Sequence, residues 1–282
     1  MTTDPETTPP AIIESGTGTP SALAGFSGVA AALGARPAVF LDYDGTLTPI
    51  MPRPDQARLD PAVRAAVAEL AALCPVAVVS GRDLDDVRAM VGLPGLVYAG
   101  SHGFDIAGPG LRHRVGEEWL PALAAAAAAL TAALGGVDGV LVERKGFAIA
   151  VHTRQVAADA KPAVAAAVGR AADAGRAGTG GVPLRVTGGK EILEIRPPVP
   201  WDKGRAVLHL LDVWGLAGAV PLFLGDDETD EDGFRAVAGV AGVGIRVGGV
   251  PAGTVTAARW TLADPSEVGA FLTRLSDHMR RA

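Results

Sequence analysis

Two aspartates separated by one residue, Asp42 and Asp44, stand at the point of this sequence best suited to chemistry. They follow the apolar run Ala38–Leu41 and precede Gly45 and Thr46. A short, continuously apolar run predicts a strand buried on both faces, as in a parallel sheet. Open α/β sheets bind their ligands beyond the carboxyl ends of such strands. Because Asp and Gly are also ordinary turn residues, this stretch alone is equally compatible with a solvated turn.

Further polar groups follow other apolar runs. Ser80 ends the run Val76–Val79, the pair Asp226 and Asp227 follows Val220–Leu224, and Lys203 lies at the start of a predicted helix. We expect these groups to converge, because the carboxyl ends of parallel strands meet at one edge of a sheet.

This set of groups is the one that phosphoryl transfer requires. Carboxylate oxygens suit Mg²⁺, and a carboxylate can attack phosphorus to form an aspartyl-phosphate. An ammonium group can stabilise the charge on the transferring phosphoryl oxygens. Since clustered acids repel one another, their presence predicts a bound cation.

Alternating strands and helices at both ends of the sequence predict a doubly wound parallel α/β core. The expected core strands are Ala38–Leu41, Val76–Val79, Leu96–Ala99, Val220–Leu224, Val243–Val247 and Trp260–Leu262. The expected core helices are Ser21–Leu33, Asp60–Leu73, Asp83–Val91, Asp202–Trp214, Asp230–Val237 and Pro265–Arg280.

The sequence pattern changes between these parts and predicts an inserted α+β domain of order αββαββ. Its expected elements are helix Trp119–Leu134, strands Val140–Arg144 and Phe147–Arg154, helix Ala157–Ala174, and strands Leu184–Thr187 and Lys190–Arg196. We therefore expect a disordered tail at 1–20, a core at 21–114 and 201–282, and an inserted cap domain at 115–200. In the inserted strands, apolar residues alternate with acids, amines and an imidazole, which fits either a binding face or a solvated one.

Composition narrows the classes of partner. The 282 residues carry a net charge of −6, with a pI of about 5.4, which argues against nucleic acid or an anionic membrane but not against a small anionic substrate. The single cysteine, Cys74, excludes an intramolecular disulfide and is expected in the core. The N-terminus does not resemble a secretory signal, and no apolar stretch is suited to spanning a bilayer, so we expect a soluble, cytoplasmic protein.

The order of these motifs resembles the haloacid dehalogenase superfamily of phosphotransferases and, within it, the trehalose-6-phosphate phosphatases. The resemblance runs from about Ala38 to the C-terminus. Its motifs are Asp42-x-Asp44-Gly-Thr, Gly100-Ser101-His102-Gly103, Lys145 with His152-x-Arg154, Gly189-Lys190 with Glu194-Ile195-Arg196-Pro197, and Gly225 to Asp232.

The resemblance implies a metal-dependent phosphatase that forms an aspartyl-phosphate. Asp42 would be the nucleophile, and Asp44 would first protonate the leaving sugar oxygen and then activate water. The Asp42 carboxylate, the Asp44 backbone carbonyl and Asp226 would hold Mg²⁺. Ser80 and Lys203 would hold the transferring phosphoryl group. Asp227 and Asp230 would hold neighbouring residues of the site in place without contacting the phosphoryl group themselves.

The resemblance also implies a small-molecule substrate, trehalose 6-phosphate. We expect the protein to be a monomer. Glu143, Lys145, Lys190 and Glu194 would bind the sugar. The other residues expected near the substrate are Gly45, Thr46, Gly81, Arg82, His102, His152 and Arg154. Two alternatives stay open: a phosphatase of another sugar phosphate such as sucrose phosphate, and a catalytically silent domain that senses a sugar phosphate.

Overall fold

The computed structural model describes residues 19–51, 53–174, 181–189, 191–216, 218–250 and 254–282. These residues form two compact units. The first unit contains the chain up to Ser80 together with Val87–Tyr98 and Asp202–Ala282, and the second contains Gly81–Asp86 and Ala99–Trp201. The tail expected at residues 1–20 lies almost entirely outside the described residues.

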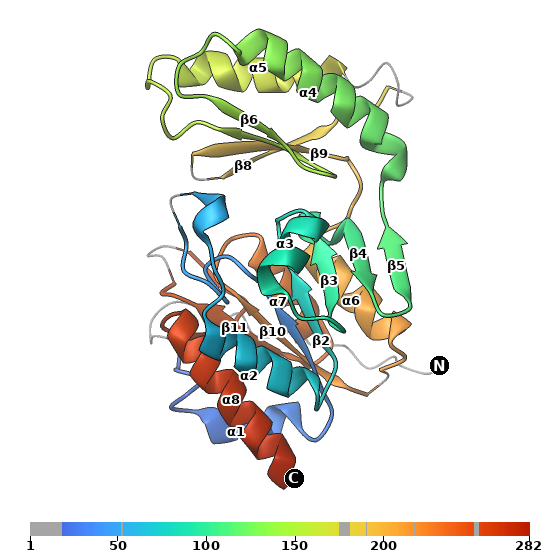
Figure 1. The fold of residues 1–282 in the computed structure, drawn as a ribbon, viewed down its shortest axis with the longest axis vertical. Coiled ribbons are helices and arrows are strands. Elements are labelled where there is room, and N and C mark those ends of the chain that lie inside the picture. The colour runs from blue at the N-terminus through green and yellow to red at the C-terminus, as the bar shows by residue number, and fades with distance from the viewer. Residues whose placement is uncertain (1–18, 52, 175–180, 190, 217, 251–253) are drawn as a thin grey trace, which may run out of the picture. The chain divides into compact units, whose positions relative to one another are not determined.

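The first unit is built on a sheet whose strand order is β12-β11-β10-β1-β2-β3 (Figure 1). The strands are β1 (Pro37–Leu41), β2 (Val76–Val79), β3 (Val97–Gly100), β10 (Val220–Gly225), β11 (Val243–Val247) and β12 (Trp260–Leu262). Strand β1 pairs in parallel with both β10 and β2, and each of its residues is buried. This confirms the expected parallel α/β core, whose central strands are continuous apolar runs because both faces are covered.

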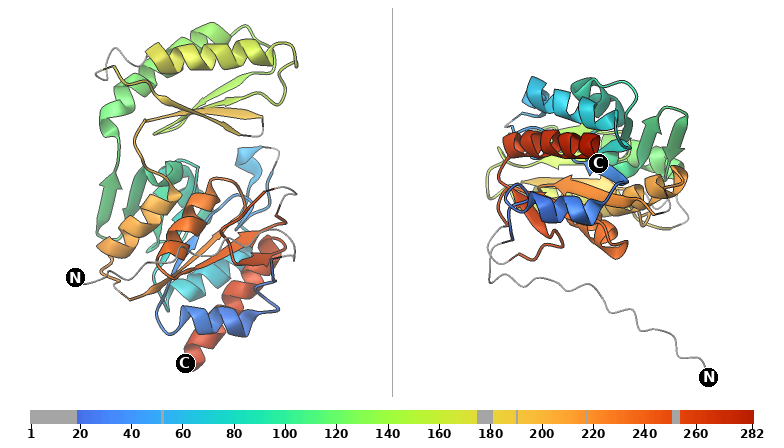
Figure 2. Two further views of the ribbon diagram at one scale, coloured as in Figure 1. Left: turned by 180° about the vertical axis from the view of Figure 1, so that it is seen from behind. Right: turned by 90° about the horizontal axis from the view of Figure 1, so that it is seen from below.

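Helices cover both faces of this sheet. They are α1 (Phe26–Leu33), α2 (Pro61–Ala71), α3 (Leu84–Val91), α6 (Lys203–Val213), α7 (Asp230–Gly239) and α8 (Pro265–Arg281). Figure 2 shows α2 and α8 on one face and α1, α6 and α7 on the other. Side-chain caps fix the starts of α2, α6 and α8. Asp60 accepts a hydrogen bond from the Ala62 N–H, Asp202 accepts one from the Arg205 N–H, and Asp264 accepts from the Ser266 and Glu267 N–H groups. Helix α1 begins at Phe26, five residues later than expected.

The second unit contains the elements of the expected insert in the expected order. They are α4 (Leu120–Leu134), β6 (Leu141–Arg144), β7 (Ile149–His152), α5 (Lys161–Ala174), β8 (Arg185–Gly189) and β9 (Ile192–Arg196). The four strands form an antiparallel sheet of order β6-β7-β9-β8. The inward residues Ile149, Val151 and Ile195 pack with α4 and α5 in one apolar cluster. One face of the sheet is therefore the core of this unit, as the alternation predicted.

The structure adds an antiparallel hairpin that the sequence did not reveal. Its strands are β4 (Asp105–Gly108) and β5 (Leu111–Arg114). They are short, and β5 reads Leu-Arg-His-Arg, so no run of apolar residues marked it. This hairpin belongs to the second unit, which is wider than the predicted insert, and the exact domain boundaries remain a prediction. Three single-turn 3₁₀ helices, η1 (Pro54–Gln56), η2 (Ser101–Gly103) and η3 (Glu117–Trp119), complete the elements named here.

Cys74 follows α2 and is half-buried rather than enclosed in the core. Burial raises the pKa of its thiol to about 12, so the thiol is protonated and unreactive at neutral pH. Among the described residues, every helix is too short or too polar to span a lipid bilayer.

Candidate active site

The carboxyl ends of β1 and β10 bring three acids of the first unit together. Asp42 follows β1, and its backbone N–H donates to the Leu224 carbonyl of β10 at 2.9 Å. Asp226 follows β10, and Asp230 begins α7. One carboxylate oxygen from each of Asp42, Asp226 and Asp230 lies within 4.8 Å of the others. The predicted convergence of Asp42 and Asp226 is therefore present, and Asp230 joins them.

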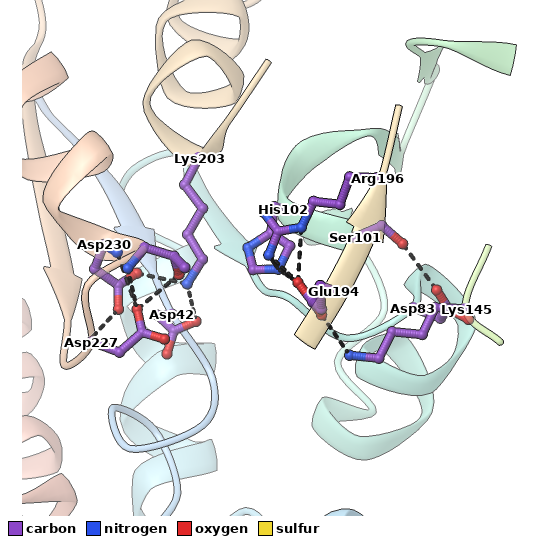
Figure 3. A network of polar contacts seen from close by, with 11 residues as sticks. Asp42, Asp83, Ser101, His102, Lys145, Glu194, Arg196, Lys203, Asp227 and Asp230 are labelled. Atoms are coloured by element: carbon purple, nitrogen blue, oxygen red, sulfur yellow. Dashed lines mark hydrogen bonds and ion pairs between the residues drawn. The ribbon is translucent and has the colours of Figure 1, made fainter. Parts of the chain in front are cut away.

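Lys203, the first residue of α6, is buried between two of these acids. Its Nζ donates to Asp42 Oδ1 at 2.8 Å and to Asp230 Oδ1 at 2.7 Å (Figure 3). The second oxygen of Asp230 accepts hydrogen bonds from the backbone N–H groups of Asp226 and Asp227, at 2.9 and 3.1 Å. Asp230 thus holds both the lysine and the loop that carries Asp226, which fits the supporting role expected of it.

Asp227 shapes the same loop by capping the start of α7. Its Oδ1 accepts from the Thr229 N–H and Oγ1, both at 2.8 Å, and from the Asp230 N–H at 3.2 Å. These bonds satisfy backbone donors that a helix start leaves unpaired. Asp227 therefore fits the predicted supporting position better than a position as a ligand.

The loop after β1 passes close to Asp226. Gly45 has φ +83°, and a Cβ at this residue would lie 2.1 Å from Asp226 Oδ2, so only glycine fits here. The loop is closed by a hydrogen bond from the Gly45 N–H to the Thr48 carbonyl at 2.7 Å. Thr46 is fully buried, and its Oγ1 has no hydrogen-bond partner among the described residues.

The acids in this cluster carry more negative charge than one ammonium can balance. Burial raises the pKa of Asp42 well above its ordinary value, although Lys203 opposes the rise. Burial, with the neighbouring acids, also raises the pKa of Asp226 to about 7 and that of Asp230 to about 6. Burial alone would lower the pKa of Lys203, but Asp230 and Asp42 raise it well above its ordinary value, so the ammonium stays charged. Excess charge on hard oxygen atoms fits a divalent cation such as Mg²⁺.

Two further predicted residues lie at the same strand ends. Asp44 is in the β1 loop, where it forms an isolated bridge with Thr48. Ser80 is buried and follows β2, the neighbour of β1 in the sheet. Gly81, Arg82 and His102 belong to the second unit, and their expected place near the substrate stays a prediction.

The outer face of the second unit's sheet carries the predicted sugar-binding acids. Glu143 on β6 lies opposite Ala150, which in turn lies opposite Glu194 on β9. His152 Nε2 contacts Glu143 Oε2 at 2.9 Å, and this bond helps to hold the pKa of Glu143 below its ordinary value.

Glu194 makes the most extensive charged contacts on this face. Its Oε1 accepts a hydrogen bond from Lys145 Nζ at 3.3 Å, and its Oε2 accepts one from Arg196. Burial would raise the pKa of Glu194, but His102, Arg196 and Lys145 together hold it well below its ordinary value. Of the other predicted sugar ligands, Arg154 is exposed beyond the end of β7, and Lys190 lies outside the described residues.

Two residues with prominent roles were missing from the predicted site. Arg196 Nε donates to Glu194 Oε2 at 2.8 Å, and its NH2 lies 2.6 Å from His102 Nε2. Asp83 Oδ1 accepts from Ser101 Oγ at 2.9 Å and from the Gly146 N–H at 2.7 Å. The two-residue spacing of Arg196 from Glu194 placed both on one face, but no sequence signal indicated the partners of Asp83.

Comparisons with known proteins show the family to which the chain belongs. The sequence pattern of the trehalose-phosphatase family matches residues 40–266. The trehalose-phosphate phosphatase of Mycobacterium bovis (strain BCG / Pasteur 1173P2) is 48% identical over 263 residues, which cover 90% of this chain. The chain spans only 65% of the length of that relative.

Solved structures share the fold. A trehalose-6-phosphate phosphatase from Aspergillus fumigatus superimposes with a TM-score of 0.62 at 26% identity, covering 93% of this chain and all of that one. A trehalose-6-phosphate phosphatase related protein superimposes with a TM-score of 0.73 at 24% identity, covering 86% of this chain and 99% of that one, and indicates the fold alone. With the family pattern extending over most of the sequence, the chain belongs to the trehalose-phosphatase family, within the haloacid dehalogenase superfamily.

Proposed function

We propose that this protein is a Mg²⁺-dependent phosphatase that hydrolyses trehalose 6-phosphate to trehalose and phosphate. The observation that carries the proposal is the buried contact of Lys203 with Asp42 inside a cluster of acids. A carboxylate held by an ammonium at a strand end is suited to attack phosphorus. Family membership and the names of the relatives favour trehalose 6-phosphate as the substrate.

In the proposed reaction, a carboxylate oxygen of Asp42 attacks phosphorus, and the bond between phosphorus and the sugar oxygen breaks. Asp44 donates a proton to the leaving sugar oxygen. Asp44 then takes a proton from water, which attacks the aspartyl-phosphate and releases inorganic phosphate and the Asp42 carboxylate. Lys203 keeps Asp42 oriented, and with Ser80 it stabilises the phosphoryl oxygens.

The carboxylates of Asp42 and Asp226 and the backbone carbonyl of Asp44 would hold Mg²⁺. When bound, the cation acts as a Lewis acid and offsets the charge of the phosphoryl group. Burial and repulsion from neighbouring carboxylates raise the pKa values of Asp42 and Asp226. This supports the assignment, because a divalent cation would offset the repulsion between the carboxylates.

For the sugar, we propose binding by Glu143, Lys145 and Glu194, together with Lys190 and His152. Glu143 on β6 and Glu194 on β9 both lie opposite Ala150 on the strand between them, so they share one face of the sheet. Both are ionised at neutral pH, so each can accept hydrogen bonds from hydroxyl groups. A cytoplasmic, monomeric enzyme without nucleic-acid or membrane partners remains the expectation. The net charge of −6 argues against binding to nucleic acid, which is itself negatively charged.

The test is phosphate release from a panel containing trehalose 6-phosphate, sucrose 6-phosphate, glucose 6-phosphate and p-nitrophenyl phosphate. It is run with Mg²⁺ and with EDTA, for wild type, Asp42→Asn and the exposed-acid control Asp55→Asn. We expect selective, metal-dependent turnover of trehalose 6-phosphate that Asp42→Asn loses and Asp55→Asn retains.

Other outcomes separate the alternatives. Faster turnover of sucrose 6-phosphate or another sugar phosphate would keep the chemistry and reject the proposed substrate. Binding of sugar phosphates without turnover of any compound would reject the enzyme and favour the silent sensing domain.

A further inference from the structure

The carboxylate of Glu194 is surrounded by cationic or hydrogen-bonding groups from three segments of the second unit. Lys145, just beyond β6, contacts Oε1 at 3.3 Å, and Arg196 on β9 contacts Oε2 through Nε at 2.8 Å and through NH2. His102 Nε2 lies 3.6 Å from the same Oε2. Figure 3 shows these side chains meeting at one point. Glu194 is only 8% exposed, so its surroundings fix it more firmly than those of a surface acid.

Arg196 makes the shortest of these contacts and connects two of the groups. Its NH2 lies 2.6 Å from His102 Nε2, so the guanidinium contacts both the imidazole and the carboxylate. His102 Nε2 lies farther from Glu194 Oε2, at 3.6 Å, than Arg196 Nε does, at 2.8 Å. Arg196 thus remains the main donor to Oε2.

The segment that carries His102 is held in an unusual backbone conformation. Ser101 has φ +49° and His102 has φ +57°, a region that residues other than glycine rarely adopt. Such conformations persist only where surrounding contacts impose them, and they gather at functional sites. Gly81 supports the same point, since a Cβ there would lie 2.8 Å from the His102 ring.

From this geometry we infer that Arg196 is a positioning residue that fixes the Glu194 carboxylate for sugar hydroxyl groups and thereby sets sugar specificity. The inference rests on the proposed function. Lys145 donates to one oxygen of Glu194 and Arg196 donates to the other. The lone pairs that remain on the carboxylate can accept hydrogen bonds only from further donors. Sugar hydroxyls are donors of this kind. A glutamate without this restraint would have to be ordered during binding, at a cost in affinity.

The experiment compares kcat/KM for trehalose 6-phosphate with that for p-nitrophenyl phosphate, which lacks a sugar. The variants are Arg196→Met, Arg196→Lys and Arg185→Met, the last being a matched control because Arg185 lies directly opposite on β8 and is exposed. We expect the ratio of the two kcat/KM values to fall about tenfold in Arg196→Met, from the lost ordering and charged hydrogen bonds. Lysine should restore it only in part, since it lacks the planar fork, and Arg185→Met should keep the wild-type ratio.

A double-mutant cycle with Glu194→Gln identifies the route of the effect. If Arg196 acts through Glu194, Arg196→Met changes the ratio little in the Glu194→Gln background. Additive effects, or equal losses on both substrates, would overturn the inference. If the wild type prefers another sugar phosphate, the proposed function fails, and the cycle is run with that sugar to test Arg196 separately.

Discussion

Lys203→Met removes an ammonium group that lies between two buried carboxylates and leaves an apolar side chain of similar length. Lys203 is 3% exposed, and its contacts with Asp42 and Asp230 measure 2.8 and 2.7 Å. Removing one partner of a buried ion pair costs about 3–5 kcal/mol, because the remaining charge stays uncompensated. At about 2–4 °C per kcal/mol, the midpoint of thermal unfolding should fall by about 6–20 °C.

The assay is thermal unfolding followed by circular dichroism in buffer without divalent cations, with Lys161→Met as the control. Lys161 forms a half-exposed pair with Glu191, and such pairs contribute about 0–1 kcal/mol. Adding Asp230→Asn to Lys203→Met should restore part of the lost stability, because it removes one uncompensated carboxylate. Phosphatase activity should not return, since Asp42 still lacks its ammonium partner.

The pH dependence has a definite sign. Lys203 lowers the pKa values of Asp42 and Asp230, so without it both carboxyl groups take up protons more readily in the folded variant than in the folded wild type. The stability lost in Lys203→Met should therefore be smaller at pH 5 than at pH 8. An unfolding midpoint within about 2 °C of the wild type at pH 8 would refute the account of a buried, paired lysine.

Three shorter predictions address the other contacts. Gly45→Ala should weaken Mg²⁺ binding, measured by calorimetry, at least about tenfold, because the new Cβ would meet Asp226. Gly34→Ala, the control, should not weaken it, because the space around Gly34 is open. Equal affinities of the two variants for Mg²⁺ would contradict this prediction. Contacts with cationic groups depress the pKa of Glu194 in the folded protein. In urea unfolding, the free energy of unfolding of the wild type should therefore exceed that of Glu194→Gln by its largest amount above the ordinary glutamate pKa of about 4.3, and the difference should shrink as the pH falls below that value. A difference independent of pH would count against the cation contacts. Glu143→Gln should raise KM for trehalose 6-phosphate more than for p-nitrophenyl phosphate, and equal changes would remove Glu143 from the sugar site.

The core strands and several helix starts could be predicted from the sequence because each depends on local features. The run Val220–Leu224 is continuously apolar, and Asp60 and Asp202 are side-chain caps next to the helices they start. The hairpin of β4 and β5 could not be predicted, because β4 has only two consecutive apolar side chains, Ile106 and Ala107, and β5 is mostly polar.

In the site, too, local features could be predicted from the sequence, and contacts between distant residues could not. The position of Asp42 at a strand end indicated its place, whereas the contacts of Arg196 did not follow from the sequence. Its partner His102 is 94 residues away, and that proximity depends on the packing of the second unit. Asp230 was expected behind the site, but its oxygens also lie within the acidic cluster, which only the fold of the loop could reveal.

Acid quenching during turnover tests whether Asp42 carries the phosphoryl group. Wild type and Asp42→Asn are mixed with trehalose 6-phosphate and Mg²⁺, quenched within the first turnover, digested and analysed by mass spectrometry. We expect one phosphoryl group on the Asp42 carboxylate of the wild type, decaying as phosphate is released, and neither adduct nor turnover in Asp42→Asn. Turnover by the wild type with no adduct at Asp42, or turnover by Asp42→Asn, would contradict this expectation.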